Sequence, residues 1–275
     1  MTISQFLQGW GAIIIAFIAL VQPLLIWTYR QLFLQGNVVI TERMRPEVGF
    51  TVMGPTMGLT GVMLCEKQTA FVTELRAVVT RIRDGSVHTF SWQLERTETI
   101  DDKGGTKVTG SIAMPFLFPS DSTRPYDELM TEAAVSGDLR TLQSQLANDW
   151  RNYVVENVGG VEKLTLPEVQ ASIPQVSQAI FPAFMQTPAY QASSAALERL
   201  FYWQADEYRL RFEIQIRGRE NPIAKTWRFR LTPEDEQSLR ANTFIVQRAI
   251  CEQPTSSFMF AYPEYLPAIA SDQNS

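Results

Sequence analysis

The chain has 275 residues, a formal net charge of -5 at pH 7, 45% hydrophobic residues and 19% charged residues. These values are typical of a folded protein and exclude a disordered chain. Because acidic residues outnumber basic ones, 29 to 24, the composition also argues against a nucleic-acid-binding protein. The two cysteines are too few for a disulfide framework.

The N-terminal region contains a run of twenty residues without a charge, from Trp10 to Tyr29. A helix of that length spans about 30 Å, the thickness of the hydrocarbon core of a bilayer. Trp10 at one end and Trp27 and Tyr29 at the other are the side chains expected at the two membrane interfaces. Residues 1–9 lack the Lys or Arg of a secretory signal, and no small-residue cleavage site follows. The sequence therefore predicts an uncleaved transmembrane helix over 10–29, rather than a signal peptide or a buried core helix.

Basic residues predict the orientation of this span. Arg30, Arg43 and Arg45 follow it, whereas the flank 1–9 has no basic side chain. An excess of Arg and Lys marks the cytoplasmic side of a membrane. We therefore expect a single-pass membrane protein whose soluble domain is cytoplasmic. A periplasmic or extracellular domain is the alternative, because Glu42 offsets part of the excess of positive charge after the span.

The rest of the chain predicts a mainly β fold. We expect a juxtamembrane segment at 30–46, an antiparallel β-sandwich-like domain at 47–267 with a helical insertion at about 126–201, and a C-terminal tail at 268–275. No Gly/Ser-rich or Pro-rich linker separates two domains in this region.

Two hairpins support the β assignment. Asp84-Gly85 lies between two strand-like runs and favours a two-residue type I′ turn. Pairing Arg83 with Ser86 then gives one apolar face, formed by the pairs Val79–Phe90, Ala77–Trp92 and Leu75–Leu94. The second hairpin alternates apolar and polar residues on both sides of a loop at 218–222. Its apolar positions are Tyr208, Leu210, Phe212, Ile214, Ile216, Trp227, Phe229 and Leu231.

Helical periodicity appears in two places. The first is an apolar stripe with Asp138 in the position of an N-cap, formed by Leu139, Leu142, Leu146, Trp150 and Tyr153. The second begins at Thr232-Pro233, with acidic residues in its first turn, and is expected to end near Asn242.

Residues that carry chemistry are sparse. His88 is the sole histidine and is expected at the rim of the first hairpin. Cys65 and Cys251 have no C-x-x-C spacing and are expected to be buried thiols. The glycine-rich segment 54–61 lacks the Gly-Lys-Ser/Thr of a phosphate-binding loop and favours a tight turn. The sequence thus predicts no catalytic site, no metal site and no cofactor, and a protein that is not an enzyme.

One charged surface stands out. The polar positions of the second hairpin are rich in arginine, and the five that we expect to form an anion-binding patch are Arg209, Arg211, Arg217, Arg228 and Arg230. Next to a bilayer such a patch would suit anionic lipid headgroups. The alternative is a solvated face whose charges are paired by nearby acids.

Small residues form a stripe on the predicted span. Ala12, Ala16, Ala19 and Pro23 recur at helical spacing, and Gln22 borders them. Small residues let two helices approach closely in lipid, so this face predicts self-association into a homo-oligomer.

These features favour a membrane-anchored binding or scaffold protein whose β-rich domain recruits a protein partner. The alternative is a membrane-acting effector of a microbial defence or toxin system, with the anchor helix oligomerising in the bilayer. The expected partners are the lipid bilayer, a protein, a second copy of the chain and anionic lipid headgroups, with no nucleic acid.

The stripe gives a direct test. Leucine at position 16 places a bulky side chain between the two backbones, so Ala16→Leu should weaken the crosslinked dimer that the wild-type chain forms in membranes. Identical monomeric patterns for both chains would show that the span is only a tether.

Overall fold

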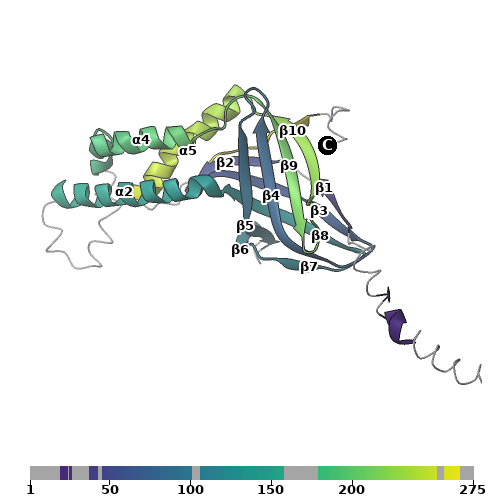
Figure 1. The fold of residues 1–275 in the computed structure, drawn as a ribbon. Helices are drawn as coiled ribbons and strands as arrows, with labels where there is room; N and C mark the ends of the chain where they lie inside the picture. Colours follow the sequence, from purple (N-terminus) through teal and green to yellow (C-terminus); the bar gives the residue numbers. More distant parts are fainter. Residues whose placement is uncertain are drawn as a thin grey trace, which may run out of the picture.

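The computed structural model describes residues 19–23, 25–26, 37–42, 45–100, 106–157, 179–252 and 257–266. A curved antiparallel sheet forms one part of the molecule, and helices project from one end of it as an arm (Figure 1). The strands are β1 (Asn37–Glu42), β2 (Glu47–Thr51), β3 (Gly54–Glu66), β4 (Ala70–Arg81), β5 (Val87–Ile100), β6 (Thr106–Ile112), β7 (Phe116–Phe118), β8 (Ser122–Glu132), β9 (Glu207–Ile216), β10 (Ile223–Arg230), β11 (Phe260–Ala261) and β12 (Tyr265–Leu266). The helices of the arm are α2 (Ala133–Asn157), α4 (Pro188–Leu200) and α5 (Pro233–Glu252).

The strands form one continuous sheet, so the prediction of a mainly β antiparallel fold is confirmed, whereas that of a two-sheet sandwich is wrong. The order is β11-β2-β3-β8-β5-β4-β9-β10-β12, with β1 on β3, β6 on β5 and β7 on β4. Strong curvature encloses the inner face (Figure 1). The Lys225 Nζ of β10 donates to the Ile40 carbonyl of β1 at 3.0 Å, which links two strands from distant parts of the order. A single curled sheet therefore buries its apolar face against itself and needs no second sheet.

The sheet also extends beyond its predicted boundaries. β1 lies inside the segment 30–46 that was expected to be only juxtamembrane, and β8 occupies the first residues of the expected helical insertion. β1 pairs with the second half of β3 from Asn37↔Glu66 to Glu42↔Gly61. At Gly61 an added Cβ would lie 2.2 Å from the Thr41 carbonyl oxygen and 2.5 Å from the Tyr126 hydroxyl, so only glycine lets these strands approach.

The first hairpin has the predicted apolar face but a different register. Ala77 lies opposite Phe90 and Val79 opposite His88, two residues away from the predicted pairing. A shift of two residues leaves the same side chains on the inner face, because the side-chain period of a strand is two. His88 is therefore opposite Val79 rather than at the rim beside Arg81.

The turn of this hairpin explains the shift. A type I′ turn needs positive φ at both central residues, but here only Gly85 has it, at 71°. The Arg81 amide donates to the Ser86 carbonyl at 2.9 Å, which leaves residues 82–85 in a longer turn. The Asp84 carboxylate accepts from Arg81 Nε and from the Ser86 amide, each at 3.0 Å, and holds that turn.

An irregularity in β5 changes the strand pairing of its second half. The register with β8 shifts between Trp92 and Leu94, so the predicted Leu75–Leu94 pair does not form. Leu75 pairs instead with Ile214 of β9, and Leu94 pairs with Leu129 of β8. Beyond the irregularity β5 turns away from β4, and β7 takes the vacated edge of β4.

The second hairpin, β9 paired with β10, confirms its prediction. The inward residues of β9 are all buried, and Phe229 and Leu231 are buried beside them. These side chains meet those of β4, since Ala77 pairs with Phe212 and Val79 with Leu210. They belong to the main core, which fills the inner side of the sheet.

The helical arm differs from prediction in its boundaries. α2 begins at Ala133, so Asp138 lies inside the helix and is not its N-cap. α5 begins after a Thr232 cap, as predicted, with Thr232 Oγ1 accepting from the Asp235 amide at 3.1 Å. The helix α5 continues ten residues past Asn242. The Asn242 side chain is buried, and its Nδ2 donates to the Met259 carbonyl while its Oδ1 accepts from the Met259 amide. The arm has a separate aromatic cluster, formed by Leu146, Trp150, Phe181, Phe184, Tyr190 and Cys251.

Most of the predicted span 10–29 lies outside the described residues. The described part, at 19–23 and 25–26, is helical, and Leu20, Leu25 and Ile26 are exposed. Within the described part of the chain, no helix combines the length and apolar character needed to cross a membrane.

The core gives a stability prediction. Phe212→Ala removes a fully buried ring, whereas Phe244→Ala removes one that is 40% exposed on α5. We expect Phe212→Ala to lower the free energy of unfolding by about 3–5 kcal/mol, and Phe244→Ala by much less. Urea denaturation of the two variants measures this difference, and equal losses would contradict the inner position of β9.

Candidate functional site

Arginine side chains cover the outer face of β4, β9 and β10. Strand register brings them together: Arg228 lies opposite Arg209, and Arg76 opposite Glu213. We define the basic face as Arg76, Arg209, Arg211, Arg228 and Arg230. The same alternation that buries the apolar side chains of β9 inside the sheet places these side chains outside it.

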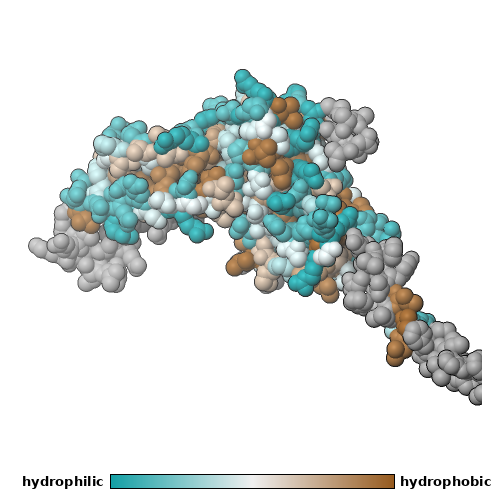
Figure 2. Space-filling view, in the orientation of Figure 1, coloured by the Kyte–Doolittle hydropathy of each residue, from teal (hydrophilic) through white to brown (hydrophobic). Residues whose placement is uncertain are grey.

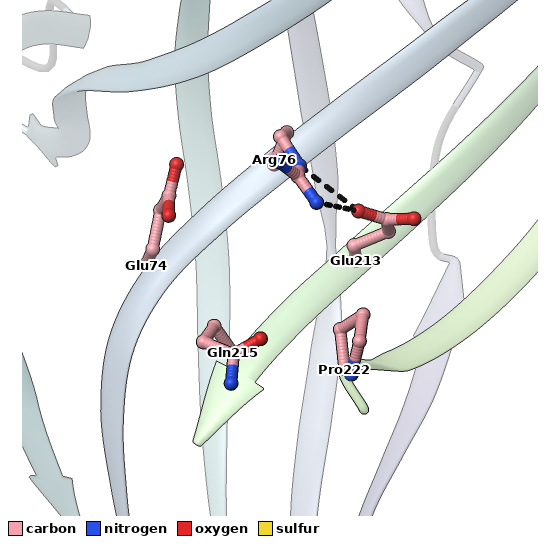
Figure 3. Close-up of a pocket in the computed structure, with 5 residues that line it drawn as sticks. All are labelled: Glu74, Arg76, Glu213, Gln215 and Pro222. Carbon is pink, nitrogen blue, oxygen red and sulfur yellow. Dashed lines mark hydrogen bonds and ion pairs between the residues drawn. The ribbon is translucent and has the colours of Figure 1, made fainter. Parts of the chain in front are cut away.

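Glu213 of β9 is the first acid that contacts this face. It accepts from Arg76 Nε at 2.9 Å and Arg76 Nη2 at 2.6 Å, and its other oxygen lies 3.0 Å from Arg211 Nε. These two arginines extend over Glu213 from neighbouring strands and bury it almost completely. Figure 3 shows the Arg76–Glu213 contact, which lines a shallow depression together with Glu74, Gln215 and Pro222.

Glu207, the first residue of β9, is the second acid that contacts this face. It accepts from Arg228 Nη2 at 2.6 Å and also from Arg230. These contacts, the bond from Arg230 first, lower the pKa of Glu207. Among the described residues, Glu207 and Glu213 contact four of these guanidinium groups, so two carboxylates face four cations in this part of the basic face. Arg211 and Arg230 remain 48% and 60% exposed, so a partner can reach them.

The structure separates one predicted residue from this group and adds another. Arg217 follows the other end of β9, eight residues from Arg209, which is roughly 26 Å along a strand. Its guanidinium lies over the Phe71 ring, 4.4 Å from the ring centroid. Arg76 comes from the first hairpin, and sequence reasoning missed it because nothing in the sequence shows that β4 pairs with β9.

Another arginine contact has a structural role. Arg96 of β5 donates to Glu47 at 2.8 Å and to Asp127 at 2.7 Å, and so joins β5 to β2 and β8. Its guanidinium lies above Gly58, where an added Cβ would be 2.8 Å from Arg96 Nη2. This cluster is mostly buried and satisfied internally, unlike the basic face.

The predicted helix-association face lies only partly within the described residues. Ala19, Gln22 and Pro23 are helical and exposed. Ala12 and Ala16 lie outside the described residues, and self-association stays a prediction.

The polar residues of the inner face form two buried groups. In the first, His88 Nδ1 lies 3.1 Å from Glu132 Oε1, and the His88 ring stacks on Tyr202 with centroids 3.5 Å apart. Burial raises the pKa of Tyr202 well above its usual value, and the Glu132 charge adds to this. A neutral phenol, a carboxyl and an imidazole are thus packed together, but no described cavity opens onto them.

The second buried group surrounds Glu128. The Trp92 indole donates to Glu128 Oε2, whereas Oε1 has no hydrogen-bond partner. Glu95 lies opposite Glu128 on the same face and accepts from Arg124 at 2.6 Å. Burial, followed by the Glu95 charge, raises the pKa of Glu128 to about 8. Glu128 is therefore largely protonated at neutral pH.

Cys65 and Cys251 are both buried, as predicted, and neither is in a disulfide. Burial raises the pKa of the Cys65 thiol, which donates to the Gln68 carbonyl at 3.0 Å. Among the described residues, no group of three or more His, Cys, Asp or Glu side chains could hold a metal ion.

Comparisons with protein-family models, curated proteins and solved structures found no match for this chain. The basic face is the strongest candidate site because it is charged, reachable and assembled from three strands.

Glu128 gives a pH prediction. Its pKa is about 8 in the folded protein and about 4.5 unfolded, so the folded state retains the proton more tightly. This contribution to stability is complete below pH 4.5 and is lost as the pH rises from there through 8, by on the order of 3–5 kcal/mol. Glu128→Gln keeps an acceptor for Trp92 but cannot ionise, so it should be more stable than wild type at pH 8 and lose less stability between pH 5 and 8. Urea midpoints across this range test it, with the exposed Glu156→Gln as the control that should follow wild type.

Proposed function

We propose that the protein is a membrane-anchored binding protein whose basic face recruits a partner through an acidic segment. The observation that carries this proposal is the basic face itself: arginines from β4, β9 and β10 on one surface, in a protein with net charge -5. A local surface of opposite sign to the whole protein favours a specific electrostatic contact over general attraction to anions.

The position of the basic face supports a protein partner rather than lipid headgroups. β1 begins at Asn37, which pairs with Glu66 beside the β3–β4 turn, and Arg217 lies at this same end of the sheet. Arg209 and Arg230 lie at the opposite end of the second hairpin, roughly 26 Å away along β9. Since the proposed anchor precedes β1, Arg209 and Arg230 lie at the end of the sheet that is farther from the bilayer. A Debye length of about 8 Å at physiological ionic strength screens them from its surface charge.

The chemistry of the face favours carboxylates. Guanidinium groups present several N–H donors that suit carboxylates, and those of the basic face already donate to Glu207 and Glu213. An acidic peptide segment can add further carboxylates along the exposed side of Arg211 and Arg230. We place this recruitment on the cytoplasmic side of the membrane, following the basic residues after the span.

Charge reversal tests the proposal. Poly-L-glutamate serves as the probe for acidic segments, and the full chain in nanodiscs should bind it with an affinity that falls as salt increases. The double variant Arg209→Glu/Arg211→Glu should lose this binding, because it replaces two cations of the face with anions.

The matched control is Arg151→Glu, an exposed position on α2 with the same change of charge per site. It should bind poly-L-glutamate like wild type. Equal binding by the double variant and wild type, or equal loss in the control, would show that the basic face is not the recruiting surface.

A further inference from the structure

The stretch between β6 and β8 is apolar and exposed. From Val108 to Ser120 the chain carries no charged residue, and it includes the prolines and phenylalanines Pro115, Phe116, Phe118 and Pro119. Met114 is 69% exposed and Leu117 is 63% exposed, whereas Phe118 is buried in the core. We name the exposed residues Ile112, Met114 and Leu117 the apolar rim. Apolar side chains that are clustered in one short segment and left in water mark an interaction surface.

Strand pairing places Leu117 at the end of the sheet where β1 begins. Leu117 pairs with Phe71 of β4, and the Cys65 thiol lies 3.5 Å from the Phe118 carbonyl. Cys65 pairs with Val38, the second residue of β1. Only residues 30–36 separate β1 from the predicted span, and they reach at most roughly 25–30 Å when extended. The start of β1, and Leu117 with it, therefore stays close to any bilayer that the span crosses.

Cations lie beside the apolar rim. Lys67 is exposed in the β3–β4 turn, next to the Asn37↔Glu66 pair. The Arg217 amide donates to the Phe71 carbonyl at 2.9 Å, and its side chain is exposed over the Phe71 ring. Exposed apolar groups flanked by Lys and Arg are typical of surfaces that enter the interfacial region of a membrane. Figure 2 shows brown surface next to teal at this lower margin of the sheet.

We propose that the apolar rim inserts into the interfacial layer of the bilayer that holds the anchor, with Lys67 and Arg217 against the lipid headgroups. This inference rests on the proposed membrane anchor. The rim and the span then fix the sheet at two points, and the basic face is turned away from the lipid. Arg217, which is remote from the basic face, acquires a role as a headgroup contact.

Lipid-borne quenchers test the proposal on the full chain. Leu117→Cys, labelled with an environment-sensitive dye, is reconstituted in vesicles of phosphatidylcholine and phosphatidylglycerol with or without brominated lipid. Val87→Cys is the matched control: it replaces another exposed apolar residue, 58% exposed, at the far end of the same sheet. Cys65 and Cys251 are buried, so the dye labels the new thiol in the native protein.

We expect loss of dye emission at Leu117→Cys with brominated lipid and unchanged emission at Val87→Cys. Carbonate extraction of the same vesicles reports separately on the anchor. A carbonate-resistant protein whose Leu117→Cys dye is not quenched overturns the rim proposal and leaves the anchor in place. Release of the protein by carbonate overturns the anchor and the rim proposal with it.

A second copy of the chain is the competing occupant of the rim. It would shield the dye in detergent micelles as well, in proportion to protein concentration and regardless of brominated lipid. That result would also overturn the proposal. Met114→Cys provides a second labelled position in the rim and should respond like Leu117→Cys.

Discussion

The pairing of β4 with β9 is the contact on which the rest of the structure depends. Its register sets two surfaces at once. Ala77 against Phe212 builds the core, and one residue along each strand Arg76 meets Glu213 on the outside. A slip of one residue would expose the core and bury the arginines, so the stability of the core fixes the geometry of the basic face. The candidate site is in this sense a consequence of packing.

Polar groups inside the sheet are tolerated for identifiable reasons. Glu128 lies on the inner face but is held as a neutral acid by burial, with the Trp92 indole as a donor. Glu132 is bonded by His88, which is covered by the Tyr202 ring. Glu132 is the last residue of β8, directly before α2, and Glu128 lies four residues earlier on the same strand. These residues specify how β5 and β8 meet, because an unpaired carboxylate there would be costly.

The two ends of the sheet have different chemistry. One end holds the start of β1, the apolar rim and the cations Lys67 and Arg217. The other end leads into the arm and holds Arg209 and Arg230 of the basic face. This polarity would suit the proposed tethered binding protein, with one end at the lipid and the other available to a partner. The helical arm has its own aromatic cluster and contacts the sheet through α2 and α5. It projects from the sheet as an arm (Figure 1).

Local sequence patterns determined much of this protein. Period-two alternation identified the inward residues of β9, and Thr232-Pro233 identified the start of α5, because both signals depend only on neighbouring residues. The arginines of the second hairpin were found for the same reason. Tertiary structure decided what depends on distant residues. Asp84 accepts hydrogen bonds from Arg81 and Ser86 in a longer turn, so the register of the first hairpin differs by two residues from the predicted one. The register shift after Trp92 leaves open the edge of β4 that β7 occupies. Arg76 belongs to the basic face only because β4 pairs with β9. The strands pair continuously into one curled sheet instead of two facing sheets, and alternation of apolar and polar residues alone does not distinguish these two arrangements.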